Sequence, residues 1–475
     1  MTDSTRTERD SLGAREIPRA AYWGVHTARA LDNFAITGDR IGNYPALITA
    51  LAAVKQAACR ANRDLGLLDT RRADAIDAAC DEIRGGALHD QFPIDPIQGG
   101  AGTSTNMNAN EVIANRALEL LGHNRGSYTE LDPLDHVNLG QSTNDVYPTA
   151  VKLAIVHHIH DLVSALGRLA NEFEGKAIEF GEIIKMGRTQ LQDAVPMTLG
   201  QEFGTFAIMV HEDCARLGEG ATLLRECNLG GTAIGTGING HPDYPALACT
   251  YLADITRIPV TSAADLIEAT QDCGAFVQIS GIVKRVAVKL SKICNDLRLM
   301  SSGPTTGLRE ISLPPVQAGS SIMPGKVNPV IPEVVNQVAF AAVGNDMTVT
   351  MAAEAGQLQL NAFEPIIPYS LLRTTAHLTA AIDTLATRCV AGITAHRDHL
   401  EQGVRRSIGI VTALTPHIGY AATARIAKQA LHTGRSVEEI ATELGLLPAE
   451  TVKSLLAPHR LAGLPVLATE RAAAQ

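Results

Sequence analysis

The stretch VYPTAVKLAIVHHIHDLVSALGRLANEF, from Val146 to Phe173, repeats its apolar residues with the period of an α-helix. The apolar positions that recur every three or four residues are Val156, Ile159, Val163, Leu166, Ala170 and Phe173. Residues with this spacing share one face of a helix, so the stretch predicts a long helix with one buried side. Similar runs cover residues 198–225, 276–297, 332–358 and 366–393. At 1.5 Å per residue, the longest of these helices are about 40 to 50 Å long.

The composition favours helices that pack closely and share a core between subunits. Hydrophobic residues make up 45% of the 475 residues, but aromatic residues only 4%, so small aliphatic side chains must supply the core. Such side chains suit long helices at close approach. Slender helices of this length bury too little surface within one chain, which favours an oligomer. We therefore expect an all-α fold, with an elongated central bundle flanked by two smaller helical domains.

The sequence pattern changes near residue 141 and again near residue 397. Residues 1–141 mix short helical patterns, such as residues 46–67 and 72–83, with loops rich in Gly, Thr and Asn, and they predict an N-terminal capping domain. Residues 142–396 hold the long helical runs of the central bundle. Residues 397–475 turn to short elements, including a capping box from Ser436 to Glu439, and they predict a small C-terminal helical domain. This tail lacks the dense basic stripe of a DNA-binding helix-turn-helix.

Charge, cysteine spacing and hydropathy restrict the setting of the protein. A formal charge of −10 argues against a nucleic-acid partner, because binding to phosphates needs clustered Lys and Arg. The eight cysteines form no CxxC pair, so we expect reduced thiols rather than a zinc ribbon or a disulfide framework. No apolar run approaches the ~18 residues of a membrane span, and the first ten residues contain no signal-peptide core. The expected protein is soluble and cytoplasmic, with no membrane partner.

Two motifs have a plain structural interpretation. The segment Gly235-Thr-Gly-Ile-Asn-Gly240 matches GxGxxG, but no strand precedes it and His-Pro follows it, so a turn-rich connection is favoured over a dinucleotide site. The cluster His157-His-Ile-His-Asp161 has ligand-like spacing. It continues along the polar side of the predicted helix, however, and a solvated face is favoured. We predict no metal site.

The segment Gly319-Ser-Ser-Ile-Met-Pro-Gly-Lys-Val-Asn-Pro329, called the serine loop below, combines two hydroxyls, an ammonium group and an amide. Its glycines permit positive φ and close backbone approach, so several N–H groups can converge on one anion. Residues 99–108, 136–145 and 187–193 are also rich in hydroxyl and amide groups. Each of these segments alone is compatible with a capping turn. Together with the lysine, such neutral donors suit a small dicarboxylate.

The serine loop resembles the signature of the aspartase and fumarase superfamily, and the similarity extends over nearly the whole chain. Members of this superfamily carry out anti-elimination across a Cα–Cβ bond and release fumarate. Residues 13–27, 141–145, 329–337 and 356–361 are more similar to aspartases than to class II fumarases. The resemblance implies reversible loss of ammonia from L-aspartate. It also implies a homotetramer with a shared multi-helix core, in which three subunits assemble each active site.

The resemblance implies a role for each matching residue. Ser320 is the expected catalytic base, which removes the Cβ proton and produces an enediolate. The expected substrate-binding residues are Thr189, Lys326 and Asn328 for the α-carboxylate, Thr103, Ser142, Thr143 and Ser321 for the β-carboxylate, and Asn144 with Gln190 for the amino group. Glu333 is expected to contact Gln190 on the side away from the substrate. The resemblance implies no organic cofactor, and the sequence leaves activation by a divalent cation or by a second aspartate open.

Two alternatives remain at this point, a class II fumarase acting on malate and a catalytically silent relative with a structural role. Gln190 stands where many superfamily members have His, and glutamine cannot titrate near neutral pH, which argues against a histidine proton relay. Leu134 makes the accessory dicarboxylate site of fumarases doubtful here. The silent relative predicts damage to the serine loop or its partners, whereas Ser320 and Lys326 are both present.

Overall fold

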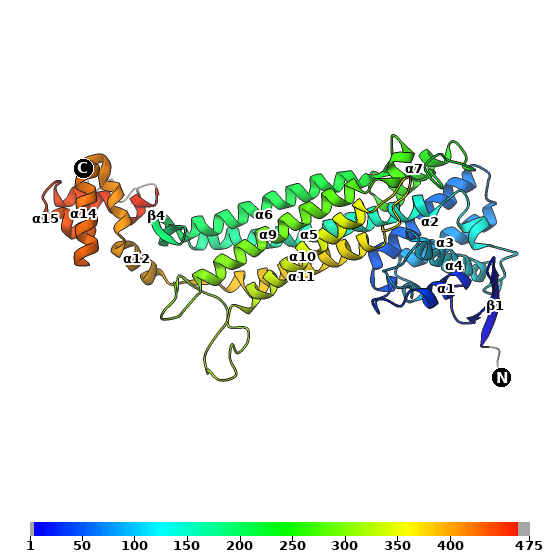
Figure 1. Ribbon diagram of the computed structural model, residues 1–475, viewed down its shortest axis with the longest axis horizontal. Helices are drawn as coiled ribbons and strands as arrows, with labels where there is room; N and C mark the ends of the chain where they lie inside the picture. The colour runs from blue at the N-terminus through cyan, green and yellow to red at the C-terminus, as the bar shows by residue number, and fades with distance from the viewer. Residues whose placement is uncertain (1–3, 464–475) are drawn as a thin grey trace. The chain divides into compact units, whose positions relative to one another are not determined.

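The computed structural model describes residues 4–463, and most of this chain is helical (Figure 1). The prediction of an all-α fold is therefore confirmed. The chain divides into two compact units. Unit 1 comprises Met1–Ser164, Ala215–Ala287 and Val338–Thr379, and unit 2 comprises Ala165–Cys214, Val288–Gln337 and Ala380–Gln475. The division into three domains stays a prediction, and residues 1–3 and 464–475 at its two ends lie outside the described residues.

Five long helices match the predicted apolar runs to within a few residues. They are α5 (Thr143–Glu179), α6 (Leu199–Ala221), α9 (Gly274–Met300), α10 (Val330–Glu354) and α11 (Ile366–Arg388). The longest, α5, has 37 residues and is therefore about 55 Å long. Each of these helices contributes residues to both units. The 3.6-residue apolar period thus identified the main elements of the fold.

Contacts between the long helices differ between the two units. In unit 1, the buried Asp346 of α10 accepts hydrogen bonds from Ser280 Oγ at 2.8 Å and Lys284 Nζ at 2.5 Å, both on α9. In unit 2, Phe173 of α5 packs edge-on against Phe206 of α6, with ring centroids 5.5 Å apart. A buried carboxylate needs such paired donors, whereas the aromatic contact needs only complementary shape.

The histidine cluster of α5 lies on the polar face, as predicted. His157 and His160 are exposed, while His158 is half-buried and its Nδ1 lies 3.0 Å from Thr375 Oγ1. Within residues 4–463, no group of three or more His, Cys, Asp or Glu side chains is arranged to hold a metal ion. No helix in the same range is sufficiently long and apolar to cross a membrane.

Shorter helices complete unit 1. They are α1 (Val25–Asn33), α2 (Pro45–Asp64), α3 (Thr70–Arg84), α4 (Thr103–Leu120), α7 (Tyr244–Thr256) and α8 (Leu266–Gln271). The predicted helical patterns at residues 46–67 and 72–83 correspond to α2 and α3. The eight cysteines all lie within residues 4–463 and form no disulfide there, and all but the half-buried Cys214 are buried.

Four small sheets of two strands each were not predicted from the sequence. Their strands are β1 (Thr5–Asp10) with β2 (Gly13–Pro18), β3 (Ile184–Thr189) with β4 (Gln192–Thr198), β5 (Glu226–Cys227) with β6 (Thr261–Ser262), and β7 (Ile311–Ser312) with β8 (Thr394–Ala395). The pairs β1–β2, β3–β4 and β7–β8 are antiparallel, and β5–β6 is parallel. Strands this short carry too few residues for an alternating apolar pattern to stand out.

Residues 397–461 of unit 2 form a cluster of short helices, in agreement with the short elements predicted there. They are α12 (Arg397–Arg406), α13 (Thr415–Ile418), α14 (Tyr420–Thr433), α15 (Val437–Glu443), α16 (Ala449–Leu455) and α17 (Pro458–Leu461). Leu414, Ile426 and Ile440 are fully buried in their shared core. The predicted cap is present, because Ser436 Oγ accepts a hydrogen bond from the Glu439 N–H at 3.2 Å.

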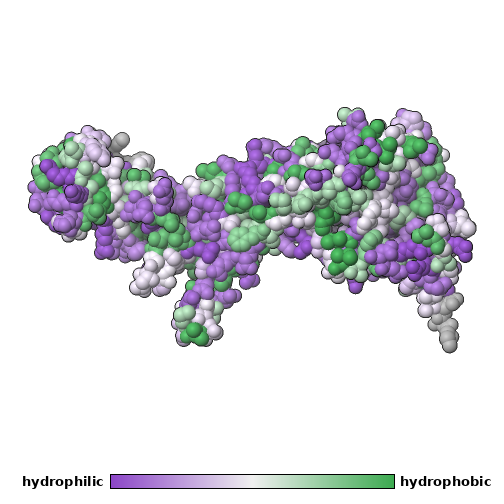
Figure 2. All heavy atoms as spheres, in the orientation of Figure 1, coloured by the Kyte–Doolittle hydropathy of each residue, from purple (hydrophilic) through white to green (hydrophobic). Residues whose placement is uncertain are grey.

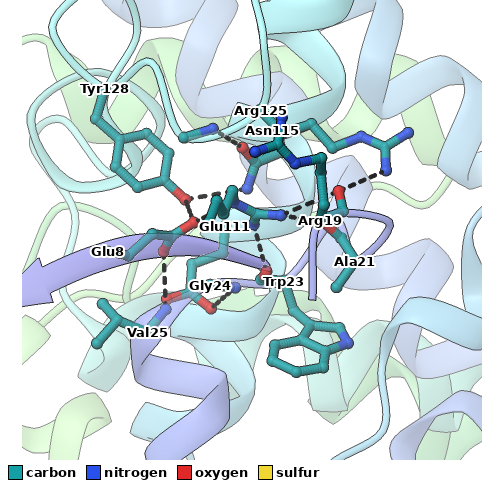
Figure 3. A network of polar contacts seen from close by, with 12 residues as sticks. Glu8, Arg19, Ala21, Trp23, Gly24, Val25, Glu111, Asn115, Arg125 and Tyr128 are labelled. Carbon is teal, nitrogen blue, oxygen red and sulfur yellow. Dashed lines mark hydrogen bonds and ion pairs between the residues drawn. The ribbon is translucent and has the colours of Figure 1, made fainter. Parts of the chain in front are cut away.

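Residues 13–27, the first of the segments that resemble aspartases, contact two buried carboxylates of unit 1 (Figure 3). Glu111 of α4 accepts a hydrogen bond from the Gly24 N–H at 2.7 Å, and Glu8 of β1 accepts one from the Val25 N–H at 2.9 Å. Burial raises the pKa of Glu111 to about 7. A Cβ on Gly24 would lie 2.4 Å from Glu8 Oε2, so a larger residue there would displace this carboxylate. This segment therefore anchors the chain to α4.

Candidate active site

Thr103 is the first residue of α4 and follows an unusual turn in unit 1. Gly100, Ala101 and Gly102 all have positive φ, at 90°, 53° and 89°. A Cβ on Gly102 would lie 2.5 Å from the ring of Tyr147, so the turn requires glycine at this position. Thr103 is exposed. The Thr103 hydroxyl donates to the Gly100 carbonyl at 2.7 Å and lies at the positive end of a helix, which favours a carboxylate.

The start of α5 lies against the start of α4. Asn106 Nδ2, one turn beyond Thr103 in α4, donates to Oγ1 of the buried Thr143 at 3.1 Å. Asp145 Oδ1 accepts from the Ser142 N–H at 3.1 Å and so fixes the residue before the helix. The structure therefore brings the three predicted β-carboxylate ligands of unit 1 to two adjoining helix N-termini.

A fully buried lysine lies beneath this segment and was missed in the sequence analysis. Lys55 Nζ donates to Asn138 Oδ1 at 2.8 Å and to Gln141 Oε1 at 2.9 Å, and burial lowers its pKa to about 7. Asp145 is also fully buried, which raises its pKa to about 7. The signal in the sequence was a single lysine within the Ala-rich, buried run of α2. These amide and charged groups form a buried hydrogen-bond network next to Ser142.

Asn144 is oriented by the loop that contains the GxGxxG motif. Its Nδ2 donates to the Ala233 carbonyl at 2.6 Å, and its own carbonyl accepts from Asn228 Nδ2 at 2.9 Å. The motif follows the two-residue strand β5, and α7 begins only at Tyr244, so the predicted turn-rich connection is confirmed. No role for this loop was predicted from the sequence, although the loop contacts a predicted substrate-binding residue.

In unit 2, Thr189 and Gln190 lie at the tip of the β3–β4 hairpin. Gln190 and Leu191 form its two-residue turn with φ values of 53° and 62°. Positive φ at both central positions is typical of hairpin turns made by Asn-Gly, and it strains larger side chains. Thr189 and Gln190 are both exposed at this tip. The strained turn therefore presents a hydroxyl and an amide side by side.

A buried ion network supports this hairpin within unit 2. Glu310 is 2% exposed and pairs with Lys185 at 2.8 Å and with Arg188, the residue before Thr189. Lys185 pairs also with Glu202, at 3.0 Å. A cavity of about 280 Å³ adjoins these residues. The network was missed because a hydropathy pattern places charged residues at the surface.

The serine loop is the last part of the connection between α9 and α10, and this connection projects away from the ends of the two helices (Figure 1). Residues 321–327 are all exposed. Ile322 is 83% exposed and Met323 48%, and Figure 2 shows hydrophobic surface at the end of the projection. Neighbouring hydrophobic side chains that are exposed in this way are typical of a surface that binds a ligand or another protein surface.

Backbone N–H groups of the serine loop converge on its first hydroxyl. Ser320 Oγ accepts from the Ile322 N–H at 3.2 Å and the Met323 N–H at 3.1 Å. The Gly319 N–H donates to the Lys326 carbonyl at 2.8 Å and closes the loop. A Cβ on Gly319 would lie 2.5 Å from that carbonyl oxygen, which explains the glycine. Two donors on one oxygen stabilise negative charge there.

The candidate residues fall into two groups. Unit 1 holds Thr103, Ser142, Thr143 and Asn144, and unit 2 holds Thr189, Gln190, Ser320, Ser321, Lys326, Asn328 and Glu333. Asn328 Nδ2 donates to the Gly319 carbonyl at 2.7 Å and so helps to close the serine loop. Glu333 is half-buried in the first turn of α10, and its contact with Gln190 stays a prediction. The individual roles also stay predictions.

Comparison with known proteins gives a consistent family. A model of the family described as "Lyase" matches residues 13–344, and one described as "Fumarase C C-terminus" matches residues 410–463. Among curated proteins, an aspartate ammonia-lyase of Helicobacter pylori is 56% identical over 456 residues. These cover 96% of this chain and 97% of the relative.

Solved structures extend the comparison to the fold. The "fumarate lyase:delta crystallin" of Brucella melitensis bound to cobalt has a TM-score of 0.95 and 56% identity, with 96% of this chain and 99% of that chain covered. A class II fumarase of Schistosoma mansoni has a TM-score of 0.92 and 36% identity, with the same coverage of both chains. The fold is thus shared with this fumarase, while the sequence is more similar to the aspartate ammonia-lyase.

Proposed function

Because the chain belongs to the lyase family, within the aspartase and fumarase superfamily, we propose that it converts L-aspartate reversibly to fumarate and ammonia. The observation that carries this proposal is the 56% identity to an aspartate ammonia-lyase over nearly the full length of both proteins. The class II fumarase is only 36% identical over the same share of this chain. The site chemistry agrees, because its donors are mostly neutral and suit a small dicarboxylate.

The first chemical problem is the weak acidity of the Cβ proton. Its removal next to the β-carboxylate gives an enediolate with one additional negative charge, which donors fixed in advance can stabilise. Thr103, Ser142 and Thr143 supply such donors at two helix N-termini of unit 1, and Ser321 adds a fourth from the serine loop. Each donor of this kind is typically worth about 10² to 10³ in rate.

The second problem is the base. A serine hydroxyl removes a carbon-bound proton only when its oxyanion is stabilised. The N–H groups of Ile322 and Met323 already point at Ser320 Oγ, which supports this role. Lys326 and Asn328 of the same loop, with Thr189, bind the α-carboxylate. Ser320 takes the Cβ proton, the electron pair forms the double bond, and the Cα–N bond breaks.

The third problem is the leaving group. Asn144 Oδ1 accepts a hydrogen bond from the substrate ammonium, and the Gln190 amide makes a second contact. Glutamine carries no titrating proton, so ammonia departs without a histidine relay. Acid–base chemistry and hydrogen bonding are sufficient for every step. The proposed reaction therefore uses no organic cofactor.

We also propose that the enzyme works as a homotetramer whose active sites each draw on three subunits. An apolar stripe on α10 supports this assembly, with Phe340, Val343, Met347 and Met351 exposed by 42% to 65%. Their spacing of three, four and four residues places them on one helix face, which a helix of another subunit can cover. The eight free thiols suit the reducing cytoplasm, where we place the enzyme.

The function is tested by offering the purified protein L-aspartate and L-malate in parallel and following the appearance of fumarate. We expect fumarate from L-aspartate and little from L-malate. Fumarate from L-malate alone would move the enzyme to the fumarases. Fumarate from neither substrate would make the chain a silent relative.

A further inference from the structure

One loop of unit 1 makes three hydrogen bonds to Asn144 and Asp145. We call Asn228 to Ala233 the clasp loop. Asn228 Nδ2 donates to the Asn144 carbonyl at 2.9 Å, and the Ala233 carbonyl accepts from Asn144 Nδ2 at 2.6 Å. The Thr232 N–H donates to Asp145 Oδ2 at 3.0 Å. Both the backbone and the side chain of Asn144 are therefore fixed by the same loop.

The backbone contact compensates for a proline inside α5. In an α-helix the carbonyl of residue 144 accepts from the N–H of residue 148, but Pro148 has no N–H. The donor that replaces it is Asn228, which is 1% exposed. The same Nδ2 also donates to Oγ1 of the buried Thr270 at 3.0 Å. Pro148 and Asn228 thus act as a matched pair.

The side-chain contact fixes which end of the Asn144 amide is free for the substrate. A backbone carbonyl only accepts hydrogen bonds, so the atom that faces Ala233 must be Nδ2. Oδ1 then points the other way, as an acceptor. An acceptor in this position binds a charged ammonium group more strongly than a neutral hydroxyl, because the hydrogen bond is charge-assisted. The clasp loop therefore holds Asn144 in the orientation that an amino substrate needs.

We propose that Asn228 and the Ala233 carbonyl are positioning groups for Asn144 and that they set the preference for the amino group of the substrate. This inference rests on the proposed function, because it assigns the contact with the substrate ammonium to Asn144. Asn228 itself touches no substrate in this account. Its effect is confined to the part of the substrate that carries nitrogen.

The test compares L-aspartate with succinate, which has both carboxylates but no amino group. In Asn228→Ala, the Asn144 carbonyl loses its donor and the amide is free to shift. A displacement of 1 Å in a positioned group costs up to about 10² in rate, so we expect kcat/KM for L-aspartate to fall about tenfold or more. The inhibition constant of succinate should change by less than about twofold, well within the ordinary effect of a remote substitution. Equal losses for both compounds would overturn the inference.

A rescue variant separates positioning from general stability. Pro148→Ala returns an N–H that can donate to the Asn144 carbonyl within α5. We expect P148A alone to resemble the wild type, and P148A/N228A to regain much of the lost kcat/KM for L-aspartate. A folded double variant that is no more active than N228A would contradict the inference. If N228A does not fold, Asn228→Asp, which keeps the shape and removes the donor, is measured for the same divergence between L-aspartate and succinate.

Thr270→Val is the matched control. It removes the other partner of Asn228 Nδ2 and leaves the contact with Asn144 in place. We expect a lower Tm and an unchanged ratio between kcat/KM for L-aspartate and the inhibition constant of succinate. A changed ratio would count against the inference. A wild-type enzyme that does not convert L-aspartate would refute the proposed function, whereas an active wild type whose N228A variant keeps the normal ratio would refute only this inference.

Discussion

The start of α5 and the serine loop carry complementary parts of the proposed chemistry, and they are built in opposite ways. Thr143 and Asp145 are buried and hydrogen-bonded on several sides. The serine loop is exposed from residue 321 to residue 327 and is closed by a few hydrogen bonds of its own. Groups that stabilise developing charge must be in place before the reaction, whereas a base on an exposed loop can close over the substrate.

The largest expected effect comes from Ser320→Ala. Loss of a general base costs about 10² to 10⁴ in rate, so kcat for L-aspartate should fall by about 10³. The thermal unfolding midpoint should stay within the error of the wild type, because the loop is exposed. Fumarate formation and calorimetry measure the two quantities. Val327→Ala, at another exposed position of the loop, is the control. Near-normal turnover of the folded S320A variant would remove Ser320 from the mechanism.

Thr143→Val tests the buried region at the start of α5. The change keeps the shape, removes a donor to the β-carboxylate and removes one of the two acceptors of Asn106 Nδ2, which also donates to Asn138 Oδ1. We expect kcat/KM to fall by about 10² and the free energy of unfolding to fall by about 1 to 3 kcal/mol. Thr149→Val is the control, because Thr149 Oγ1 donates only to the Asp145 carbonyl one turn further along α5. Thr149→Val should lower the free energy of unfolding, as Thr143→Val does, but should leave kcat/KM unchanged. Equal losses of kcat/KM in the two variants would argue against a role for Thr143 in binding.

Two glycine substitutions should separate activity from stability most clearly. In Gly319→Ala the new Cβ meets the Lys326 carbonyl and opens the serine loop. We expect about a tenfold loss of kcat/KM, less than the 10² of a full 1 Å displacement in a closed site. Little change in Tm should accompany it. If Tm fell strongly instead, the loop would be part of the folded core rather than a mobile cover.

Gly102→Ala is the counterpart in the buried turn before α4, against which α5 begins. Its Cβ would overlap the ring of Tyr147, at a position with a φ of 89°. Overpacking together with positive φ should lower the free energy of unfolding by about 2 to 4 kcal/mol. Chemical denaturation measures this quantity. Equal stability of the two glycine variants would contradict the difference between the two regions.

The long helices could be predicted because their apolar period extends over many turns, and the Ser436 cap because its partner lies three residues away. Lys55 and Glu310 could not be predicted as buried groups, since their burial depends on amide and charged partners far away in the sequence. The role of the clasp loop escaped prediction for a similar reason. The GxGxxG motif that follows it matched a dinucleotide site, whereas the clasp loop itself contacts Asn144, more than eighty residues earlier. A missing N–H at Pro148 was the only local sign.

If the start of α5 holds fixed donors and the serine loop carries a mobile base, the two regions must differ in amide hydrogen exchange. Without ligand, we expect the amides of residues 321–326 to exchange rapidly and those of residues 145–151 to be protected. Addition of succinate should slow exchange in the serine loop and leave the start of α5 unchanged. Strong protection of the serine loop in the free enzyme, or succinate-dependent protection confined to α5, would contradict the account.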